Sequence, residues 1–150
     1  MTTDLLLAIA HHLLIFGLVA VLAAETVLVR PGLTGNALSR LGGIDRAYGL
    51  VAVLIIIVGF SRVFFGLKGW EFYIYNWVFW AKIAAFATVG LLSIRPTISI
   101  LEWSRKAKAD AAHVVPDSEI ASVRTWLRAE GAVFVLIPIF AAAMARGIGY

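Results

Sequence analysis

Four long runs of apolar residues constrain the fold of this chain more than any other feature. They cover about residues 5–29, 46–65, 77–101 and 124–146. Each is close to the roughly 20 apolar residues that a helix needs to cross the hydrocarbon of a bilayer. Because lipid offers no hydrogen bonds to the backbone, a spanning segment is either a helix or part of a closed barrel. Barrel strands are short and alternate in polarity, and these runs do not, so the sequence predicts four membrane-spanning helices.

The composition supports a membrane protein and argues against several other classes. Of the 150 residues, 61% are hydrophobic and 15% are charged, whereas a typical soluble domain is roughly 45–50% apolar and about 25% charged. We therefore expect neither an ordinary water-soluble enzyme nor a disordered chain. The net charge of +4 comes from basic residues at the edges of the apolar runs, which suits lipid headgroups rather than nucleic acid. The chain has no cysteine, which excludes disulfides and thiolate chemistry.

The order of the runs predicts the architecture. Short connections favour an all-α, antiparallel bundle of four helices that forms one integral membrane domain over residues 1–150. The first and third connections are the most basic, so the positive-inside rule places them in the cytoplasm and both termini on the outer, periplasmic side. Their basic residues are Arg30, Arg40, Arg46, Arg105, Lys106, Lys108, Arg124 and Arg128. Asp45, which follows the breaker Gly42-Gly43, is expected to cap the second helix.

The most informative residues are the polar ones inside the apolar runs. An ionisable side chain in the hydrocarbon costs about 3 kcal/mol or more, so it usually faces the interior of a bundle. In an up-and-down bundle these residues fall into two layers with an apolar middle. The layer on the outer side holds His11, His12, Arg62, Lys82 and Met144. The opposite layer holds Glu25, Asp45, Arg46, Tyr48, Arg95, Arg128 and Glu130.

These residues also have purely structural interpretations. The histidines could hydrogen-bond to neighbouring helices, and Lys82 could extend its ammonium group to the membrane interface. Glu25 could pair with Arg30 where the first helix ends. Arg62 suits a headgroup contact, and Met144 suits plain core packing. The sequence leaves these alternatives open beside the functional ones.

The histidines restrict the metal chemistry that the bundle can hold. His11 and His12 are adjacent, so on a helix their side chains point about 100° apart. No other apolar run carries a histidine. A haem would therefore have one histidine ligand, with water, Met144 or Lys82 on its other face. No His-x-x-x-His or Glu-x-x-His pair lies within a run, which disfavours zinc-protease and di-iron sites.

Several short motifs resemble one family of bacterial membrane proteins. They are His11-His12-Leu13-Leu14, Ala23-Ala24-Glu25, Asp45-Arg46-Ala47-Tyr48-Gly49-Leu50, Phe79-Trp80-Ala81-Lys82, Leu91-Leu92-Ser93-Ile94-Arg95-Pro96-Thr97 and Ala143-Met144-Ala145-Arg146-Gly147. Together they span nearly the whole chain, and they are similar to the bacterial domain of unknown function 2214. The resemblance implies a multi-pass, four-helix protein of the bacterial inner (plasma) membrane and names no activity.

A more distant similarity is to the small J-type protoporphyrinogen oxidase of bacteria and to the copper-resistance D membrane domain. In the J-type enzyme, a histidine early in the first helix and a lysine early in the third are associated with haem and activity. His11 or His12, and Lys82, occupy corresponding places, and Arg128-Ala129-Glu130 resembles the start of its fourth helix. This resemblance implies a haem b site and redox chemistry.

The first functional hypothesis is a redox protein that binds haem b or a related tetrapyrrole. His11 or His12, with Met144 as a further candidate, would hold the iron. Lys82 and Arg62 are the candidate catalytic residues, which would hold the propionates or an anionic substrate. The ligand would be a tetrapyrrole or another small hydrophobic molecule.

The second hypothesis is a non-enzymatic membrane carrier, metal-binding protein or assembly partner. Its intramembrane metal or proton site would draw on His11, His12, Glu25, Asp45 and Glu130. A third interpretation is a structural bundle whose polar groups only fix the register of the helices. Whether the protein is an enzyme therefore stays open at this point.

Small residues on the first run add one further expectation. Such residues let two membrane helices approach closely, so this face could pack against a helix of the same chain or of a second copy in a homo-oligomer. The small residues are Ala8, Gly17, Ala20, Ala23 and Ala24.

Overall fold

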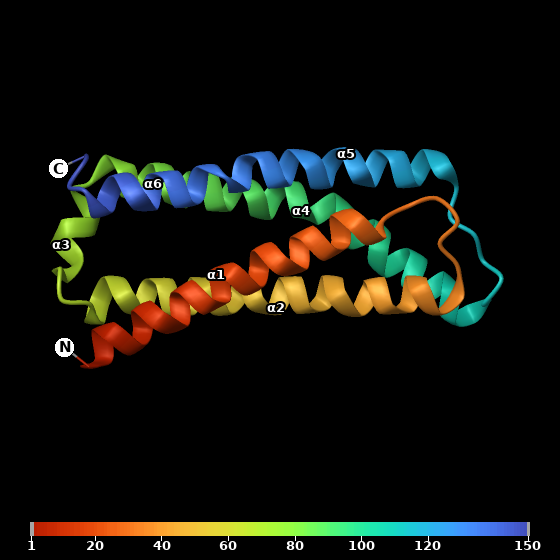
Figure 1. The fold of residues 1–150 in the computed structure, drawn as a ribbon, viewed down its shortest axis with the longest axis horizontal. Coiled ribbons are helices and arrows are strands. Elements are labelled where there is room, and N and C mark those ends of the chain that lie inside the picture. Colours follow the sequence, from red (N-terminus) through yellow and green to blue (C-terminus); the bar gives the residue numbers. More distant parts are fainter. Residues whose placement is uncertain (1, 150) are drawn as a thin grey trace.

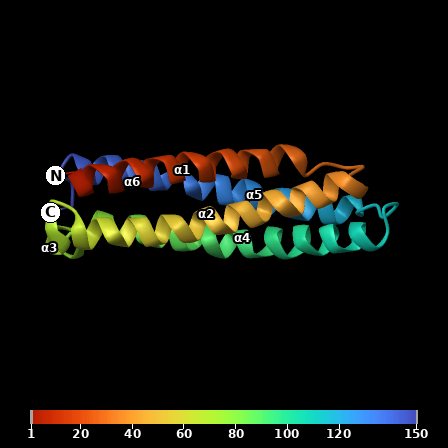
Figure 2. The same cartoon turned by 90° about the horizontal axis from the view of Figure 1, so that it is seen from below.

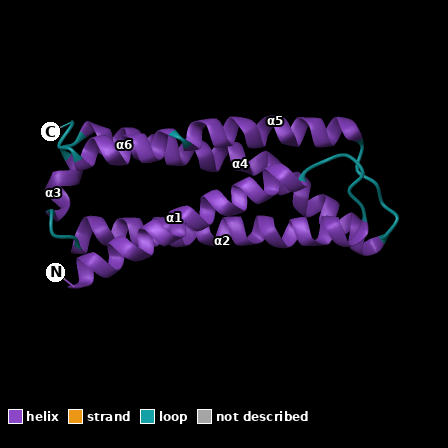
Figure 3. Ribbon diagram, viewed as in Figure 1, coloured by secondary structure: helices purple, strands orange, loops and turns teal. Residues whose placement is uncertain are grey.

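The computed structural model describes residues 2–149, and 84% of the chain is helical. Its helices are α1 (Thr2–Leu28), α2 (Gly35–Phe65), α3 (Gly69–Ile74), α4 (Trp77–Ala109), α5 (Asp117–Phe134) and α6 (Leu136–Ala145). No strand is present in the described part, and the extended contact it contains is an isolated bridge between Thr34 and Val114. The prediction of an all-α protein is therefore confirmed (Figure 3).

Four helical segments within residues 2–149 are long and apolar enough to cross a membrane. They are α1, α2, α4 and the combined segment of α5 and α6, Asp117–Ala145. Each of these segments contains all or most of one apolar run of the sequence. The prediction of four spanning helices agrees with their length and composition.

The long helices lie along one axis and run back and forth between the two ends of the molecule (Figures 1 and 2). α1 packs on α2, α2 packs on α4, and α4 packs on both α5 and α6. α1 also contacts α5, and in Figure 1 it crosses obliquely over α2 and ends before the end opposite the termini, to which the connection after it continues. Both ends of the chain lie at the same end of the molecule, beside α3 (Figure 1). We call this the terminal end, and the opposite one the loop end.

At the loop end, the first and third long connections are tied together. Thr34 forms the bridge with Val114, and a Cβ atom added at Gly35, whose φ is +48°, would lie 3.1 Å from the Ala111 carbonyl oxygen. A left-handed backbone and so little room both favour glycine. Leu33 is buried there. The two connections therefore close this end of the molecule.

At the terminal end, Asn76 joins the start of α4 to the last described residues. Its side-chain oxygen accepts hydrogen bonds from the backbone N–H groups of Val78 and Phe79, at 2.9 and 3.3 Å. Its side-chain nitrogen donates to the Ile148 carbonyl at 3.2 Å. The Trp77 N–H donates to the Gly149 carbonyl at 3.3 Å. Asn76 is thus an N-cap that also fastens the tail.

Three helices are longer than the apolar runs indicate. α2 begins at Gly35 rather than near residue 46, α4 continues to Ala109, and α5 begins at Asp117. A helix does not have to end where the hydrocarbon ends, because its backbone stays hydrogen-bonded in water. The prediction that Asp45 caps the second helix is wrong, since Asp45 lies inside α2 and is buried. The Gly42-Gly43 pair does not break the helix, because Gly42 packs against Ser104 of α4.

Two prolines lie within the spanning segments. Pro138 follows the interruption at Val135 that separates α5 from α6. A proline ring clashes with the carbonyl four residues earlier and removes one backbone donor, and that carbonyl belongs to Phe134. Pro96 is buried inside α4, which continues past it. The Arg95-Pro96 motif therefore does not end this helix.

Large apolar side chains lie both inside the bundle and on its outer surface. Leu18, Leu38, Ile100, Trp103 and Leu127 are fully buried in one core that draws on α1, α2, α4 and α5. Many others are exposed along the outer faces of the helices, including Leu13, Phe16, Phe60, Phe64, Leu91 and Ile98. Exposed apolar side chains at this density suit contact with hydrocarbon rather than with water.

Candidate functional site

Three carboxyl side chains from three helices are buried toward the loop end. Glu25 of α1, Asp45 of α2 and Glu130 of α5 are only 2%, 3% and 1% exposed. Tyr48 of α2 and Thr97 of α4 join them through hydrogen bonds. We refer to these five residues as the carboxyl cluster. The sequence predicts an inner polar layer at this height, and the structure brings four of its seven members together here.

The hydrogen bonds of the carboxyl cluster connect neighbouring helices. The Tyr48 hydroxyl donates to Glu130 Oε1, which joins α2 to α5. The Thr97 hydroxyl donates to Asp45 Oδ1 at 2.9 Å, which joins α4 to α2. Glu25 Oε1 is buried and has no hydrogen-bond partner among the described residues. Two carboxyl groups therefore each accept one hydroxyl, and the third has an unsatisfied oxygen.

The carboxyl groups act on one another electrostatically, and basic groups do not neutralise them. Negative charges on Asp45 and Glu130 both repel a negative charge on Glu25. A negative charge on Asp45 also repels one on Glu130. The positive charge of Arg46 attracts a negative charge on Asp45, but the Arg46 side chain is exposed. Between residues 2 and 149 the structure contains one ion pair, Glu102 with Lys106 at 2.7 Å, and this pair is half-exposed. The alternative that Glu25 pairs with Arg30 is therefore not realised.

Three basic side chains from three helices meet nearer the terminal end. The positive charges of Lys82 on α4 and Arg62 on α2 both disfavour a positive charge on His11 of α1. The charge of Arg62 also repels that of Lys82. His11 Nδ1 and Arg62 Nε are buried without a hydrogen-bond partner among the described residues. The His11 ring packs on Gly59, where an added Cβ would lie 3.3 Å from Cε1. We refer to His11, Arg62 and Lys82 as the basic cluster.

Aromatic side chains surround the basic cluster. The Lys82 ammonium lies 5.4 Å from the centre of the Phe79 ring, a cation–π arrangement. Phe79 packs with Val63 and Tyr73 in a small apolar cluster, and Met144 packs against that cluster. Burial raises the pKa of Tyr73 above its ordinary value, and the nearby charge of Arg62 opposes that rise. The setting favours an anionic group beside the two cations, Arg62 and Lys82, with the His11 imidazole next to them.

The two adjacent histidines have different surroundings. His11 is half-buried within the basic cluster, whereas His12 is exposed on the outer face of α1. His12 Nδ1 donates to the Ala8 carbonyl of the same helix at 2.7 Å. The centres of the two rings are 6.4 Å apart and the ring planes are nearly perpendicular. Of the two histidines, only His11 lies where it can share a ligand with Arg62 and Lys82.

The candidate metal ligands of the sequence do not form one group. Within residues 2–149, no three side chains of histidine, cysteine, aspartate or glutamate are arranged to hold a metal ion. His11 lies in the basic cluster, His12 is exposed, and the carboxyl groups form their own cluster. The remaining candidates of the inner layer, Arg46, Arg95 and Arg128, are exposed.

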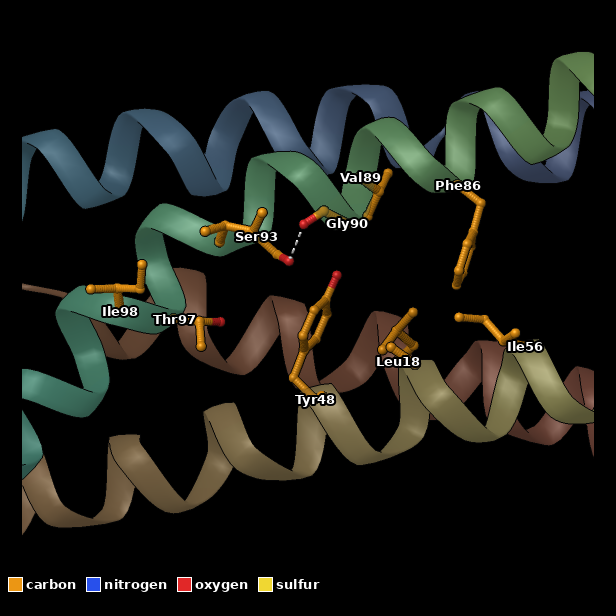
Figure 4. A pocket seen from close by; sticks show the side chains of 12 residues that line it. Leu18, Tyr48, Ile56, Phe86, Val89, Gly90, Ser93, Thr97 and Ile98 are labelled. Carbon is orange, nitrogen blue, oxygen red and sulfur yellow. Dashed lines mark hydrogen bonds between the residues drawn. The ribbon is translucent and has the colours of Figure 1, made fainter.

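A cavity of about 350 Å³ lies between α2 and α4 beside the carboxyl cluster. Tyr48 and Thr97 form part of its wall, and so do apolar side chains such as Leu18, Phe86 and Val89. In Figure 4 the Tyr48 side chain extends from α2 toward α4. Ser93 lines the same cavity and donates to the Gly90 carbonyl at 2.8 Å (Figure 4). The cavity therefore joins an apolar space to the hydroxyl groups of the cluster.

Sequence reasoning did not single out Thr97 or Ser93 as functional residues. Both belong to the Leu91–Thr97 motif, which resembles a helix exit because it contains Arg95-Pro96. The available signal was the spacing of Phe86, Gly90, Ser93 and Thr97, because residues three or four apart share one face of a helix. Once Pro96 is placed inside α4, that face is the one that lines the cavity.

Comparison with known proteins gives one match. No curated protein and no solved structure matches the chain. One protein family, described as "Predicted membrane protein (DUF2214)", matches residues 3–149, and this range includes both polar clusters and all four spanning segments. The chain therefore belongs to the DUF2214 family of predicted membrane proteins.

Proposed function

We propose that this protein takes up and releases protons within the membrane at its carboxyl cluster. The observation that carries the proposal is the burial of Glu25, Asp45 and Glu130 on three different helices without an ion-pair partner among residues 2–149. Three ionised carboxylates in so apolar a setting repel one another and lose their hydration. Bound protons remove both costs, so the cluster is suited to hold protons and to exchange them.

The same proposal includes a topology. The four spanning segments cross the inner membrane of a bacterium as an antiparallel bundle, with both termini on the periplasmic side. Its support is the location of both termini at one end of the molecule (Figure 1) and the excess of arginine and lysine in the connections at the loop end. In this orientation the carboxyl cluster is nearer the cytoplasm and the basic cluster nearer the periplasm.

Proton movement tests the proposal in vesicles that contain a pH-sensitive dye. With the wild-type protein, an imposed pH difference should decay faster than in protein-free vesicles. The variants Glu25→Gln and Glu130→Gln should slow this decay severalfold, because an amide neither binds nor releases a proton near neutral pH. The amide oxygen that Glu130→Gln introduces can still accept the Tyr48 hydroxyl, so we expect the second variant to fold.

The control for these variants is Glu102→Gln, which changes a half-exposed carboxylate on α4 and should leave the decay unchanged. Equal decay in the wild type and both buried variants would contradict proton exchange at the cluster. Metal analysis of the same samples separates a bound cation from a proton, since a resident cation would co-purify with the wild type and be lost from Glu25→Gln.

A second candidate function is the binding of haem b or a related tetrapyrrole at the basic cluster. The observation that favours it is the buried, unpartnered His11 Nδ1 beside Arg62 and Lys82. His11 would hold the iron. Arg62 and Lys82 would hold the propionates, because hydrogen bonds between a cation and a carboxylate are stronger than those between neutral groups. Such a group would supply one-electron chemistry. His12 fits this role less well because it is exposed and bonded to Ala8.

An absorbance spectrum of the detergent-purified protein tests this second candidate. A haem protein should show a Soret band that His11→Ala abolishes and that His12→Ala leaves in place. The two residues are adjacent on one helix, so each variant is a matched control for the other. Absence of the band after expression with added haem, or its loss in both variants alike, would contradict a site built on His11.

A further inference from the structure

The cavity between α2 and α4 has one polar side and is otherwise apolar. On α4, Phe86, Gly90 and Thr97 lie on the face that lines it, and on α2 Tyr48 and Ile56 do so. Leucine, isoleucine, valine and aromatic side chains make up most of the wall. A volume of about 350 Å³ is within the range of sites for small ligands, which are mainly apolar with a few placed polar groups.

The polar side of the cavity offers hydrogen-bond acceptors rather than donors. Each of the three hydroxyl groups in the wall already donates its hydrogen elsewhere. Tyr48 donates to Glu130, Thr97 donates to Asp45, and Ser93 donates to the Gly90 carbonyl. Their oxygen lone pairs stay available. A ligand that brings an O–H group can bond to them at once, whereas a ligand that brings only a carbonyl must first break one of these bonds.

The mouth of the cavity faces the surroundings of the bundle. Ile56, Ile94 and Ile98 line the cavity and are 45%, 49% and 57% exposed. Because these side chains lie on spanning helices, they face hydrocarbon when the protein is in a membrane. A ligand would therefore enter sideways from the bilayer, and any apolar tail that it carries could stay among the lipid chains.

We propose that this cavity binds a membrane-dissolved phenol or hydroquinone, with its ring between α2 and α4 and its O–H group donating to the hydroxyl oxygens of Tyr48, Ser93 or Thr97. The aromatic side chains of Tyr48 and Phe86 on the wall favour a ring over a flexible chain. Figure 4 shows these two side chains on opposite helices of the cavity. The proposal concerns ligand binding and does not depend on proton exchange at the carboxyl cluster.

Calorimetric titration of the purified protein with three related probes tests the proposal. The probes are an alkyl hydroquinone, the corresponding quinone and the corresponding dimethyl ether. They share one ring and one tail, and only the hydroquinone carries O–H donors. We expect the hydroquinone to bind about tenfold more tightly than either analogue, as the loss of a hydrogen bond predicts.

Gly90 provides a variant that fills the cavity without disturbing the fold. A Cβ atom at Gly90 meets no other atom within 4 Å, so a side chain can leave the helix there without a clash at its first carbon, and leucine favours a helix more than glycine does. Gly43→Leu is the matched control, because Gly43 is also helical with nothing within 4 Å and does not line the cavity. Binding of the hydroquinone should be lost in the first variant and retained in the second.

Other results would overturn the inference. If all three probes bind equally, the cavity accepts any apolar molecule, such as an acyl chain, and the hydroxyl groups select nothing. If Gly90→Leu binds the hydroquinone as tightly as the wild type does, the ligand lies elsewhere. Tighter binding of the quinone than of the hydroquinone would show that the wall donates hydrogen bonds rather than accepting them.

Discussion

At the scale of single residues, the bond between Tyr48 and Glu130 gives the carboxyl cluster its shape. It joins α2 to α5, two helices that do not pack directly on each other. A buried hydroxyl and a buried carboxyl oxygen both lose their hydrogen bonds to water on folding. The bond between Tyr48 and Glu130 replaces the lost bond of each group. The unpartnered Glu25 oxygen is the exception. This Oε1 atom therefore carries an uncompensated loss of hydration in this structure.

Removal of the Tyr48 hydroxyl should therefore destabilise the protein. Tyr48→Phe leaves Glu130 Oε1 buried without a partner, a change that typically costs about 1–3 kcal/mol. Tyr75→Phe is the control, because the Tyr75 side chain is 73% exposed. Thermal melting followed by circular dichroism in detergent should show a lower midpoint for the first variant only. Equal midpoints for both variants would mean that this bond adds nothing to stability.

The amino-acid sequence predicts the positions of some of these residues and not of others. It identifies Glu25 and Glu130 as inward-facing groups, because an ionisable residue in an apolar run has few other places to go. It places Asp45 at the same height but as a helix cap, whereas the structure buries that residue inside α2. It does not separate His11 from His12, since α1 is apolar on nearly all sides and gives no signal for its inner face. It does not identify Thr97, because a hydroxyl residue in a helix usually bonds to its own backbone.

At the scale of the elements, α2 and α4 approach closely where a glycine meets a serine. A Cβ atom at Gly42 would lie 2.5 Å from Ser104 Oγ and 2.6 Å from Ser104 Cβ. Ser104 is itself 1% exposed. Small residues at a helix contact are typical of membrane proteins, in which dispersion contacts between helices replace the hydrophobic effect. The Gly42-Gly43 pair is predicted from the sequence to be a breaker, but it serves this contact instead.

Substitution of the two adjacent glycines should give opposite results. Gly42→Ala forces α2 away from α4 and should destabilise the protein by about 1–3 kcal/mol. Gly43→Ala meets nothing within 4 Å and should stabilise it by about 0.5–1 kcal/mol, since alanine is the better helix former. Unfolding by increasing fractions of a denaturing detergent measures both changes. Ser104→Gly should rescue Gly42→Ala, and failure of that rescue would contradict the close contact.

The bounds of the elements depend on forces that apolar runs do not report. α4 continues to Ala109 with Trp103 and Ala107 buried in the core and the pair Glu102–Lys106 on its surface. Packing of these two side chains stabilises this part of the helix more than the half-exposed ion pair does. α5 begins at Asp117, directly after Pro116 and far before its apolar run. An acidic first turn suits a helix start. The runs therefore predict that the four helices exist and leave their ends undetermined.

At the scale of the whole molecule, two polar clusters lie at different heights in an apolar bundle. The connections at one end are joined by the bridge between Thr34 and Val114. The other end contains α3 and both termini (Figure 1). The basic cluster lies nearer to this end than the carboxyl cluster does, because its residues precede Glu25 on α1, follow Tyr48 on α2 and precede Thr97 on α4. The order of the apolar runs predicts this layout, because each short connection must return the chain to the membrane. The basic residues of the connections are the basis for the proposed orientation, in which the carboxyl cluster is nearer the cytoplasm.

Single cysteines test the proposed orientation without background, since the natural chain has none. In intact cells, a membrane-impermeant maleimide should label Thr3→Cys and Ile148→Cys at once. Pro31→Cys and Ala112→Cys, in the two connections at the loop end, should react only after the cells are opened. Labelling of all four variants from outside, or the opposite pattern, would contradict termini on the periplasmic side.

The fastening of the tail to Asn76 has a consequence for the order in which the protein matures. Ile148 and Gly149, whose carbonyls accept from Asn76 and Trp77, follow all six described helices in the chain and are synthesised after them. Until then the first turn of α4 has only the Asn76 side-chain cap. Among the described residues, these two contacts therefore form only after α1 to α6 have been synthesised, so the start of α4 gains its full set of hydrogen bonds later than the rest of that helix.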